Sequence, residues 1–123
     1  MQSRHLILLS LLVVLALVTA RGAGAGDGLL RVYFLDVGQG DAIFIQAPNG
    51  NQVLIDGGPN GEVLGELGKI MLPADREIDV VLVSHPHADH ISGLIEVLKR
   101  YDVRAIVQAR EIYRSLEFAA WQD

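Results

Sequence analysis

Between residues 29 and 56, apolar residues come in short runs that are rich in β-branched and aromatic side chains and are separated by turn residues. This pattern is typical of β-strands. The expected strands are 29–36, 42–46 and 52–56. Asn49-Gly50 lies between the last two strands and suits the left-handed positions of a type I′ hairpin turn. The sequence therefore predicts an antiparallel meander in this part of the chain.

After residue 57 the pattern changes to an alternation of helices and strands. Val63, Leu67 and Ile70 fall on one face of a helix. The run 79–84 is apolar almost throughout, as expected for a strand buried on both faces. The expected elements are a helix at 62–72, a strand at 79–84, a helix at 92–101, a strand at 103–108 and a helix at 111–121. Strand, helix and strand in succession predict a βαβ unit with a parallel sheet and a right-handed crossover, so the fold class is α/β.

The N-terminal residues form a separate segment. Arg4 and His5 precede residues 6–18, which are apolar apart from Ser10, and small residues follow. This order is typical of a secretory signal, and it predicts an exported protein, either extracellular or periplasmic. The run is shorter than the roughly 20 residues of a transmembrane helix, and an uncleaved membrane anchor over 4–20 is the alternative. The expected organisation is a leader at 1–20, a Gly/Ala linker at 21–28 and a folded domain at 29–123.

Composition narrows the chemistry that the domain can use. The formal net charge is −5 at pH 7, which excludes a basic nucleic-acid footprint in the bulk charge. This balance mildly favours a small substrate over a DNA duplex. The chain has no cysteine, so it has no disulfide and no thiolate ligand for zinc. Any bound metal must therefore be held by histidines and carboxylates.

The strongest chemical signal is a cluster directly after the strand at 79–84. His85, His87 and His90 lie close together, with Asp89 between the last two. In an open parallel sheet, ligands gather at the carboxyl ends of strands. Residues i and i+2 of an extended segment share a side, so His85 and His87 can bind one ion, and a turn into the next helix brings Asp89 and His90 to a neighbouring point. Imidazole and carboxylate suit Zn²⁺, and less selectively Mn²⁺ or Fe.

A blander interpretation of the same cluster is a solvated loop in which Asp89 is the N-cap of the following helix. The density of histidines favours the metal site. Asp56, at the end of the third strand, is either a carboxylate that orients a metal-bound histidine or a turn aspartate, and its spacing does not decide between them. Asp36 and Asp41 flank a glycine turn that lacks the lysine of a phosphate loop, so we expect Asx hydrogen bonds there.

Two stretches of the chain carry a family resemblance. The stretch HPHADH resembles the His-x-His-x-Asp-His signature of the metallo-β-lactamase-fold hydrolases. The stretch FLDVGQGDAIFIQAPNGNQVLIDGG resembles the opening strands of one branch, the hydrolase domain of ComEC-type DNA-uptake proteins and their secreted relatives. The resemblance covers residues 30–107. It implies a four-layer αβ/βα sandwich, of which this chain would hold only the N-terminal half.

The resemblance also implies roles for individual residues. His85 and His87 would bind a first metal, and Asp89 and His90 a second, usually both Zn²⁺, with a metal-bound hydroxide that attacks the substrate. By this resemblance Asp89 would be both a metal ligand and the candidate catalytic residue. Asp56 matches the early structural aspartate of the family, which favours the orienting role. The implied activity is that of a phosphodiesterase or nuclease acting on a phosphodiester, with DNA as a candidate partner.

One departure from the family pattern leaves three functions open. The family adds a third histidine to the first metal, then a bridging aspartate and a last histidine, and no histidine follows His90 in this chain. Two ligands per metal are fewer than the three that an open zinc site needs. The alternatives are therefore a phosphodiesterase completed by further residues, a hydrolase of a lactone, lactam or thioester on the same fold, and an inactive half-domain. Contact with a membrane is expected only through the N-terminal segment.

Overall fold

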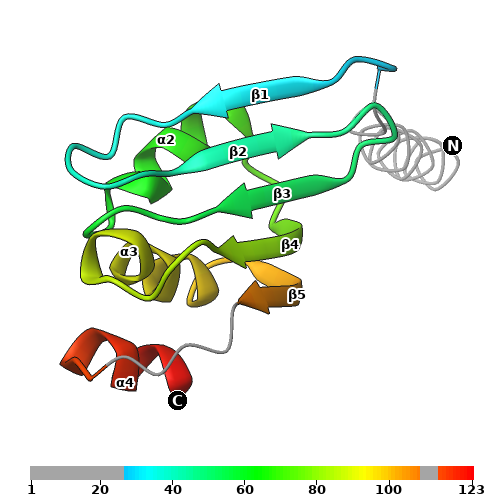
Figure 1. Cartoon of the computed structure of the whole chain (residues 1–123). Helices are drawn as coiled ribbons and strands as arrows, with labels where there is room; N and C mark the ends of the chain where they lie inside the picture. The colour runs from blue at the N-terminus through cyan, green and yellow to red at the C-terminus, as the bar shows by residue number, and fades with distance from the viewer. Residues whose placement is uncertain (1–26, 109–113) are drawn as a thin grey trace, which may run out of the picture.

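The computed structural model of the chain describes residues 27–108 and 114–123, so the predicted leader and most of the linker lie outside the described residues. The strands are β1 (Arg31–Phe34), β2 (Ile43–Gln46), β3 (Gln52–Ile55), β4 (Glu77–Val83) and β5 (Asp102–Gln108). The helices are α2 (Glu62–Ile70), α3 (Ala88–Leu98) and α4 (Leu116–Gln122). Each predicted strand and helix has a counterpart in the described part of the chain, with bounds that differ at the ends (Figure 1). The first residues of the helix predicted at 111–121 lie outside the described residues.

The strands form one mixed sheet in the order β1-β2-β3-β4-β5. β1, β2 and β3 pair antiparallel, which confirms the predicted meander. β3 and β4 pair in parallel, and so do β4 and β5, which confirms the parallel strands of the predicted βαβ unit. The carboxyl ends of β3, β4 and β5 therefore meet at one edge of the sheet, on the left of Figure 1.

The hairpin between β2 and β3 forms, but its predicted turn type is wrong. Gly50 has a positive φ of 91°, whereas Asn49 does not have a positive φ, and a type I′ turn needs both. The N–H of Gly50 donates to the carbonyl of Ala47 at 2.9 Å, so the turn centres on Pro48-Asn49. The pyrrolidine ring of Pro48 fixes φ at the value that the first central position of an ordinary turn requires.

One face of the sheet packs against the helices and forms the core. Phe44, Leu54 and Val81 project from β2, β3 and β4 and are fully buried. They belong to the same apolar cluster as Leu67 of α2 and Leu94 of α3. Burying a side chain of this size contributes roughly 1.5–3 kcal/mol, so this cluster is the main source of stability.

α4 extends this layer beside α3. Trp121 is buried, and its indole N–H donates to the side-chain oxygen of Gln108, at the end of β5, over 2.6 Å. Ser115 caps the helix by accepting a hydrogen bond from the N–H of Phe118 at 3.0 Å. None of the helices in 27–108 and 114–123 is long and apolar enough to cross a membrane.

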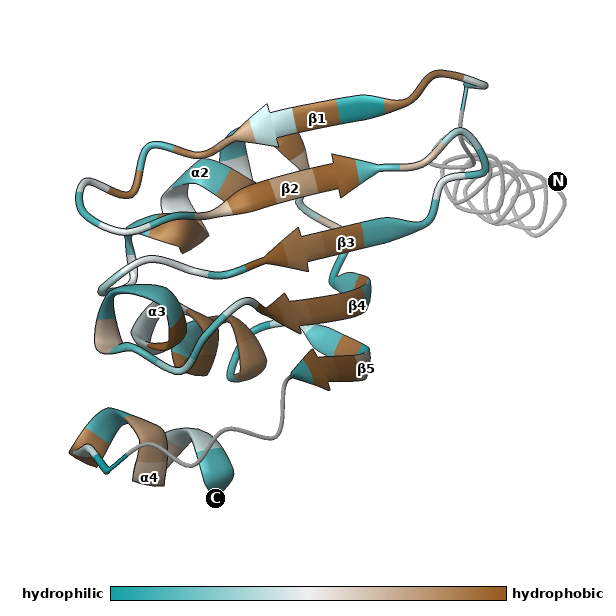
Figure 2. Ribbon diagram, viewed as in Figure 1, coloured by the Kyte–Doolittle hydropathy of each residue, from teal (hydrophilic) through white to brown (hydrophobic). Residues whose placement is uncertain are grey.

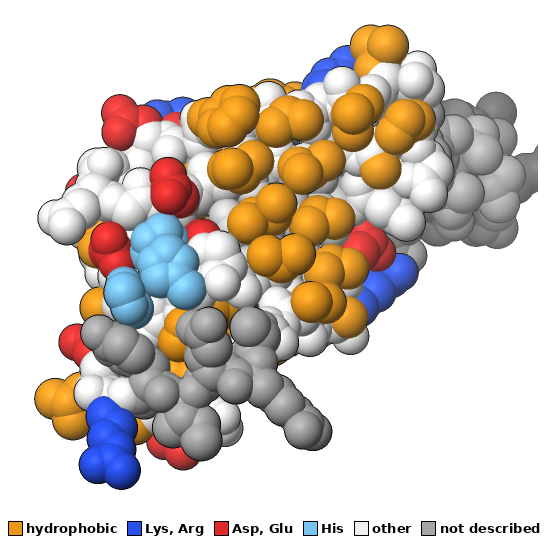
Figure 3. All heavy atoms as spheres, in the orientation of Figure 1, with side chains coloured by type: hydrophobic (Ala, Val, Ile, Leu, Met, Phe, Trp, Pro, Cys, Tyr) orange, Lys and Arg blue, Asp and Glu red, His pale blue; other side chains and the backbone are white. Residues whose placement is uncertain are grey.

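The opposite face of the sheet is apolar and lies open in the described part of the chain. The strand register places these side chains on it: Val32, Phe34, Ile43, Ile45, Val53, Ile55, Val80, Leu82, Ala105 and Val107. We call this surface the open sheet face. Each of its side chains is exposed or half-buried, and Phe34 is 80% exposed. Figure 3 shows hydrophobic side chains gathered over the strands, and in Figure 2 much of the strand ribbon has the brown colour of hydrophobic residues.

The prediction that the strand at 79–84 is buried on both faces is therefore wrong for these residues. Val81 is fully buried, whereas Val80 and Leu82 on the open sheet face are only half-buried. The reason is that the described helices cover one face of the sheet and leave the other without a second layer. The described residues form an α/β arrangement of two layers, and the other layers of the four-layer sandwich that the resemblance implied stay a prediction.

Candidate metal centre

The histidine-rich segment lies where the sequence placed it, between β4 and α3. His87 is the N-cap of α3, with extended backbone angles, and the helix begins at Ala88. The prediction that this helix begins at Ser92 is wrong, because Asp89 and His90 already lie in its first turn, and the N–H of His90 donates to the carbonyl of His87 at 2.9 Å. Asp89 is consequently not the N-cap, although a carboxylate in the first turn is favoured by the helix dipole.

The imidazole rings lie against one another. The ring centroid of His85 is 4.6 Å from that of His87 and 3.9 Å from that of His90. The Oδ1 atom of Asp89 lies 3.7 Å from Nε2 of His90. His87 is exposed, His85 and Asp89 are half-buried, and His90 is only 6% exposed. All four predicted ligands therefore share one region of the surface, which borders the open sheet face in Figure 3.

Asp56 is a buried carboxylate, only 2% exposed, at the carboxyl end of β3. Its φ is +57°, a left-handed value that aspartate tolerates better than most residues. Its Oδ2 atom lies 2.9 Å from Nδ1 of His90, and its Oδ1 atom accepts a hydrogen bond from the N–H of Ser84 at 2.8 Å. This contact is the one expected of a carboxylate that orients a histidine, while the role of that histidine toward a metal stays a prediction.

Ser84 links Asp56 to a second histidine. Its hydroxyl group donates to Oδ2 of Asp56, and its Oγ atom lies 2.9 Å from Nδ1 of His85. The sequence interpretation did not include Ser84 among the site residues. Its position at the carboxyl end of β4, directly before His85, was the available signal.

Glycines let the neighbouring loops approach this segment closely. A Cβ atom on Gly40 would lie 1.9 Å from the carbonyl oxygen of Asp89, and Gly40 has a positive φ of 78°. A Cβ atom on Gly93 of α3 would lie 1.7 Å from the carbonyl oxygen of Gly57. The N–H of Gly57 donates to the carbonyl of His90 at 2.8 Å. Both contacts require glycine, so the glycines at positions 40, 57 and 93 let the loops after β1 and β3 support the position of the histidine segment.

The turn between β1 and β2 has the predicted Asx contact. The N–H of Gly38 lies 3.4 Å from Oδ1 of Asp36, a long hydrogen bond. At the other side of the turn, the carbonyl of Asp41 accepts a hydrogen bond from the N–H of Gly58 at 3.0 Å. The turn therefore braces the loop after β3, which agrees with its interpretation as a structural turn.

The donor atoms suit a metal, but they do not form a complete ligand set. Imidazoles and a carboxylate are the ligands that zinc prefers in a chain without cysteine. Within 27–108 and 114–123, however, no group of three or more histidine, aspartate or glutamate side chains is arranged to hold a metal ion. Open zinc sites use three protein ligands. The segment therefore fits a metal centre as part of a ligand set.

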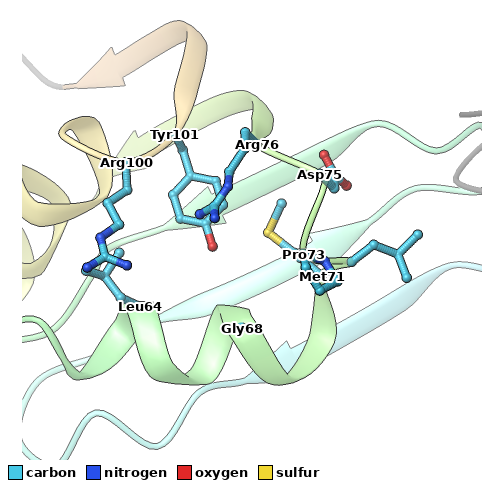
Figure 4. A pocket seen from close by; sticks show the side chains of 9 residues that line it. Leu64, Gly68, Met71, Pro73, Asp75, Arg76, Arg100 and Tyr101 are labelled. Atoms are coloured by element: carbon cyan, nitrogen blue, oxygen red, sulfur yellow. The ribbon is translucent and has the colours of Figure 1, made fainter. Parts of the chain in front are cut away.

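A pocket of about 230 Å³ lies elsewhere, at the opposite end of β4 (Figure 4). It is lined by Leu64, Gly68, Met71, Leu72, Pro73, Asp75, Arg76, Arg100 and Tyr101. The guanidinium carbon of Arg76 lies 5.8 Å from the centre of the Tyr101 ring, and both arginine side chains lie at the exposed surface. This pocket contains none of the predicted ligands and is separate from the histidine segment.

Comparison with known proteins identifies relatives of the chain. The family model for the metallo-beta-lactamase superfamily matches residues 35–123. In curated proteins, microtubule-associated protein 1S of Homo sapiens is 43% identical over 78 residues, which are 59% of this chain and 7% of that protein. The protein of the same name from Bos taurus is 41% identical over 81 residues, which are 62% of this chain and 7% of that protein. The chain thus spans only a small part of the length of these relatives.

Two solved structures share the fold. The Rm3 metallo-beta-lactamase superposes with a TM-score of 0.51 at 22% identity, over 67% of this chain and 33% of that one. MEM-A1, a subclass B3 metallo-beta-lactamase isolated from a soil metagenome library, gives a TM-score of 0.50 at 24% identity, over 65% of this chain and 31% of that one. At these identities the likeness concerns the fold alone.

Proposed function

The chain belongs to the metallo-beta-lactamase superfamily, and on this premise we propose that it forms the N-terminal half of a metal-dependent hydrolase domain that acts on a phosphodiester. The superfamily typically binds metal ions, often zinc, and zinc is the metal that we propose here. The observation that carries the proposal is the gathering of His85, His87, Asp89 and His90 at the carboxyl end of β4.

The proposed ligands divide into two pairs. His85 and His87 belong to the first metal, and Asp89 and His90 to the second. When bound, zinc supplies a Lewis acid that polarises a substrate oxygen and lowers the pKa of water. Asp56 keeps the Nδ1 side of His90 occupied, so that Nε2 is the nitrogen that faces a ligand. Asp89 is the half-buried carboxylate nearest to that nitrogen, which supports its proposed role in catalysis.

The open sheet face supports the proposal that another half completes the domain. Contiguous apolar surface of this kind marks an interaction site or an aggregation hazard in a soluble protein. A second sheet would pack onto it about 10 Å away, as in other sheet-on-sheet arrangements. This chain aligns with 33% of the Rm3 enzyme, and the remaining length of such a domain would be available to supply both the second sheet and the missing ligands.

The choice of a phosphodiester rests on the resemblance of residues 34–58 to the ComEC-type branch. A smaller ester or amide is the alternative substrate, because a protein with a net charge of −5 repels the phosphate backbone of a DNA duplex. Export of the protein through the predicted leader is part of the same proposal.

Metal content and turnover in the intact protein test this function. We expect bound zinc and hydrolysis of a generic phosphodiester such as bis(p-nitrophenyl) phosphate. His87→Ala should remove most of the bound zinc and lower the rate by at least about 100-fold, because an open zinc site that loses one of its ligands no longer holds the ion firmly. Asp36→Ala is the matched control, since this exposed aspartate lies in the turn between β1 and β2 and outside the proposed ligand set. Unchanged zinc content and rate in His87→Ala would refute the assignment. Faster turnover of a lactone than of the phosphodiester would contradict the proposed substrate class and favour a lactone, lactam or thioester.

A second candidate function is a binding module without catalysis. It is favoured by the identity of 43% to part of a protein whose name describes association with microtubules, and by the incomplete ligand set in the described residues. An intact, folded protein that neither retains zinc nor hydrolyses either substrate would favour this candidate over the enzyme.

A further inference from the structure

The hydrogen bonds of the Ser84 hydroxyl group determine which nitrogen of His85 carries the proton. The Oγ atom of Ser84 carries a single hydrogen, and the hydroxyl group donates it to Oδ2 of Asp56. The same oxygen lies 2.9 Å from Nδ1 of His85. Because the hydroxyl hydrogen is already used, Oγ can only accept from this nitrogen. Nδ1 of His85 must therefore carry the proton of the neutral ring.

We propose that Ser84 is a positioning residue that fixes the Nδ1–H tautomer of His85, so that the lone pair of His85 lies on Nε2. Asp56 fixes the same tautomer in His90 directly, because a carboxylate oxygen only accepts and Nδ1 of His90 lies 2.9 Å from it. A single carboxylate thus sets two imidazoles, one by direct contact and one through a serine hydroxyl group.

Burial strengthens the contact between Asp56 and His90, whereas the contact between Ser84 and His85 lies at the exposed surface. The side chains of Asp56 and His90 are 3% and 8% exposed, so water competes weakly for their hydrogen bonds. The second oxygen of Asp56 is held by the N–H of Ser84 at 2.8 Å, which ties the carboxylate and the hydroxyl group to the same backbone. Asp56 itself is fixed by its N–H, which donates to the carbonyl of Leu82 at 2.9 Å.

The consequence for a metal is that both rings present the same nitrogen. A histidine whose wrong nitrogen carries the proton must change tautomer before it can bind an ion through Nε2. Partners that fix the tautomer of a ligating histidine typically change metal affinity by 10- to 100-fold. This effect on affinity rests on the proposed function, whereas the tautomer of the metal-free protein does not.

Nitrogen-15 spectroscopy of the histidine rings tests the tautomer without a metal. The intact protein is measured at pH 8, above the ordinary histidine pKa of about 6.5, after chelation of metals. We expect the proton on Nδ1 in both His85 and His90. In Ser84→Ala, His85 should shift toward the Nε2–H form while His90 stays unchanged, because Asp56 still contacts it directly. Ser84→Thr keeps a hydroxyl group and should restore the Nδ1–H form.

Either of two results would overturn the proposal. One is a proton on Nε2 of His85 in the unmodified protein, a measurement that does not depend on any variant folding. The other is an unchanged His85 tautomer in a folded Ser84→Ala protein. Zinc affinity by chelator competition is the second readout, with at least about tenfold weaker binding expected in Ser84→Ala and rescue in Ser84→Thr. A shifted tautomer in a protein that binds no zinc would leave the positioning role intact and refute the proposed metal function instead.

Discussion

At the scale of single residues, Asp56 does the most to shape the site. It is buried, it accepts hydrogen bonds from the backbone and the hydroxyl group of Ser84, and it contacts His90. No buried side-chain polar atom in the described residues lacks a partner. Removing the carboxylate would leave the N–H of Ser84 and Nδ1 of His90 without a hydrogen-bond partner. Buried groups that lose their partners lower the free energy of unfolding.

We therefore expect Asp56→Ala to lower the free energy of unfolding by about 3 kcal/mol, the sum of roughly 1–3 kcal/mol for each group left unsatisfied. Asp56→Asn should lose less, because asparagine keeps one acceptor and tolerates the left-handed backbone. Urea denaturation followed by circular dichroism measures the change. Asp36→Ala, at an exposed aspartate in a turn, should stay within about 0.5 kcal/mol of the unmodified protein. Equal losses in Asp56→Ala and Asp36→Ala would show that the buried network is not stabilising.

The residue pattern predicted the four candidate ligands, whereas the contact of Asp56 with a histidine was favoured only by the family resemblance. Neither predicted Ser84, because serine after a strand is common and its hydroxyl group acquires a role only when β3 and β4 lie side by side. Counting ligands in the sequence already indicated fewer than three per metal, whereas the way in which the rings lie against one another required the structure.

At the scale of elements, the glycine turn between β1 and β2 determines where the first turn of α3 lies. Gly40 packs its backbone against the carbonyl of Asp89, at a distance that excludes any side chain. The antiparallel meander and the parallel unit thus meet at this contact. The sequence predicted a tight turn there, but the contact itself joins residues far apart in the chain and required the tertiary structure.

Alanine at Gly40 would clash with Asp89 and disfavour the positive φ of this residue. Gly40→Ala should therefore lower the free energy of unfolding by roughly 2–4 kcal/mol. It should also displace the histidine segment and weaken zinc binding by at least about tenfold. Gly65→Ala is the matched control, since a Cβ atom there meets nothing within 4 Å and alanine is the better helix former by about 1 kcal/mol. Thermal unfolding of both variants provides the comparison. A Gly40→Ala protein as stable as the Gly65→Ala protein would contradict the assigned contact.

The start of α3 lies four residues before the predicted start, and the reason is physical. The expected helix began at Ser92 because the apolar spacing begins there, but the helix starts at Ala88 with polar residues in its first turn. The carbonyl of His90 accepts a hydrogen bond from the N–H of Gly57, and the N–H of Gly93 donates to the carbonyl of Gly58 at 3.0 Å. These backbone contacts, together with the buried side chain of Ile91, hold the first turn in place.

At the scale of the whole molecule, the two faces of the sheet differ in what covers them. The apolar runs predicted the antiparallel pairing of β1, β2 and β3 and the parallel pairing of β4 and β5, whereas the parallel pairing of β3 with β4 was not predicted. A strand that is apolar on both sides indicates two buried faces, and β4 carries that signal. Only one face of β4 is buried in the described residues. The apolar residues on its other face therefore predict a second covering layer, which the described residues do not contain.

The open sheet face should make this chain associate when it is expressed from residue 27 onward. We expect oligomers in size-exclusion chromatography with light scattering, and binding of the dye ANS. Replacing Phe34 and Ile45 with threonine should increase the monomer fraction at little cost in stability, since both side chains lie on the open sheet face. Phe44→Ala, on the buried face, should instead cost about 3–5 kcal/mol. A monomeric chain that binds no dye would show that the open face is covered.

The contact between Gly57 and Gly93 has a consequence for recognising distant relatives. Any side chain at Gly93 would collide with the backbone of Gly57, so α3 can lie this close to the end of β3 only while both positions stay without side chains. The approach of the two glycines involves no imidazole, so substitution of the exposed His87 would leave this contact in place. The glycine pair is therefore a signature of the fold, and the histidines are a signature of the proposed metal site. Sequences that keep both glycines but lack the histidines should have this fold and no bound metal.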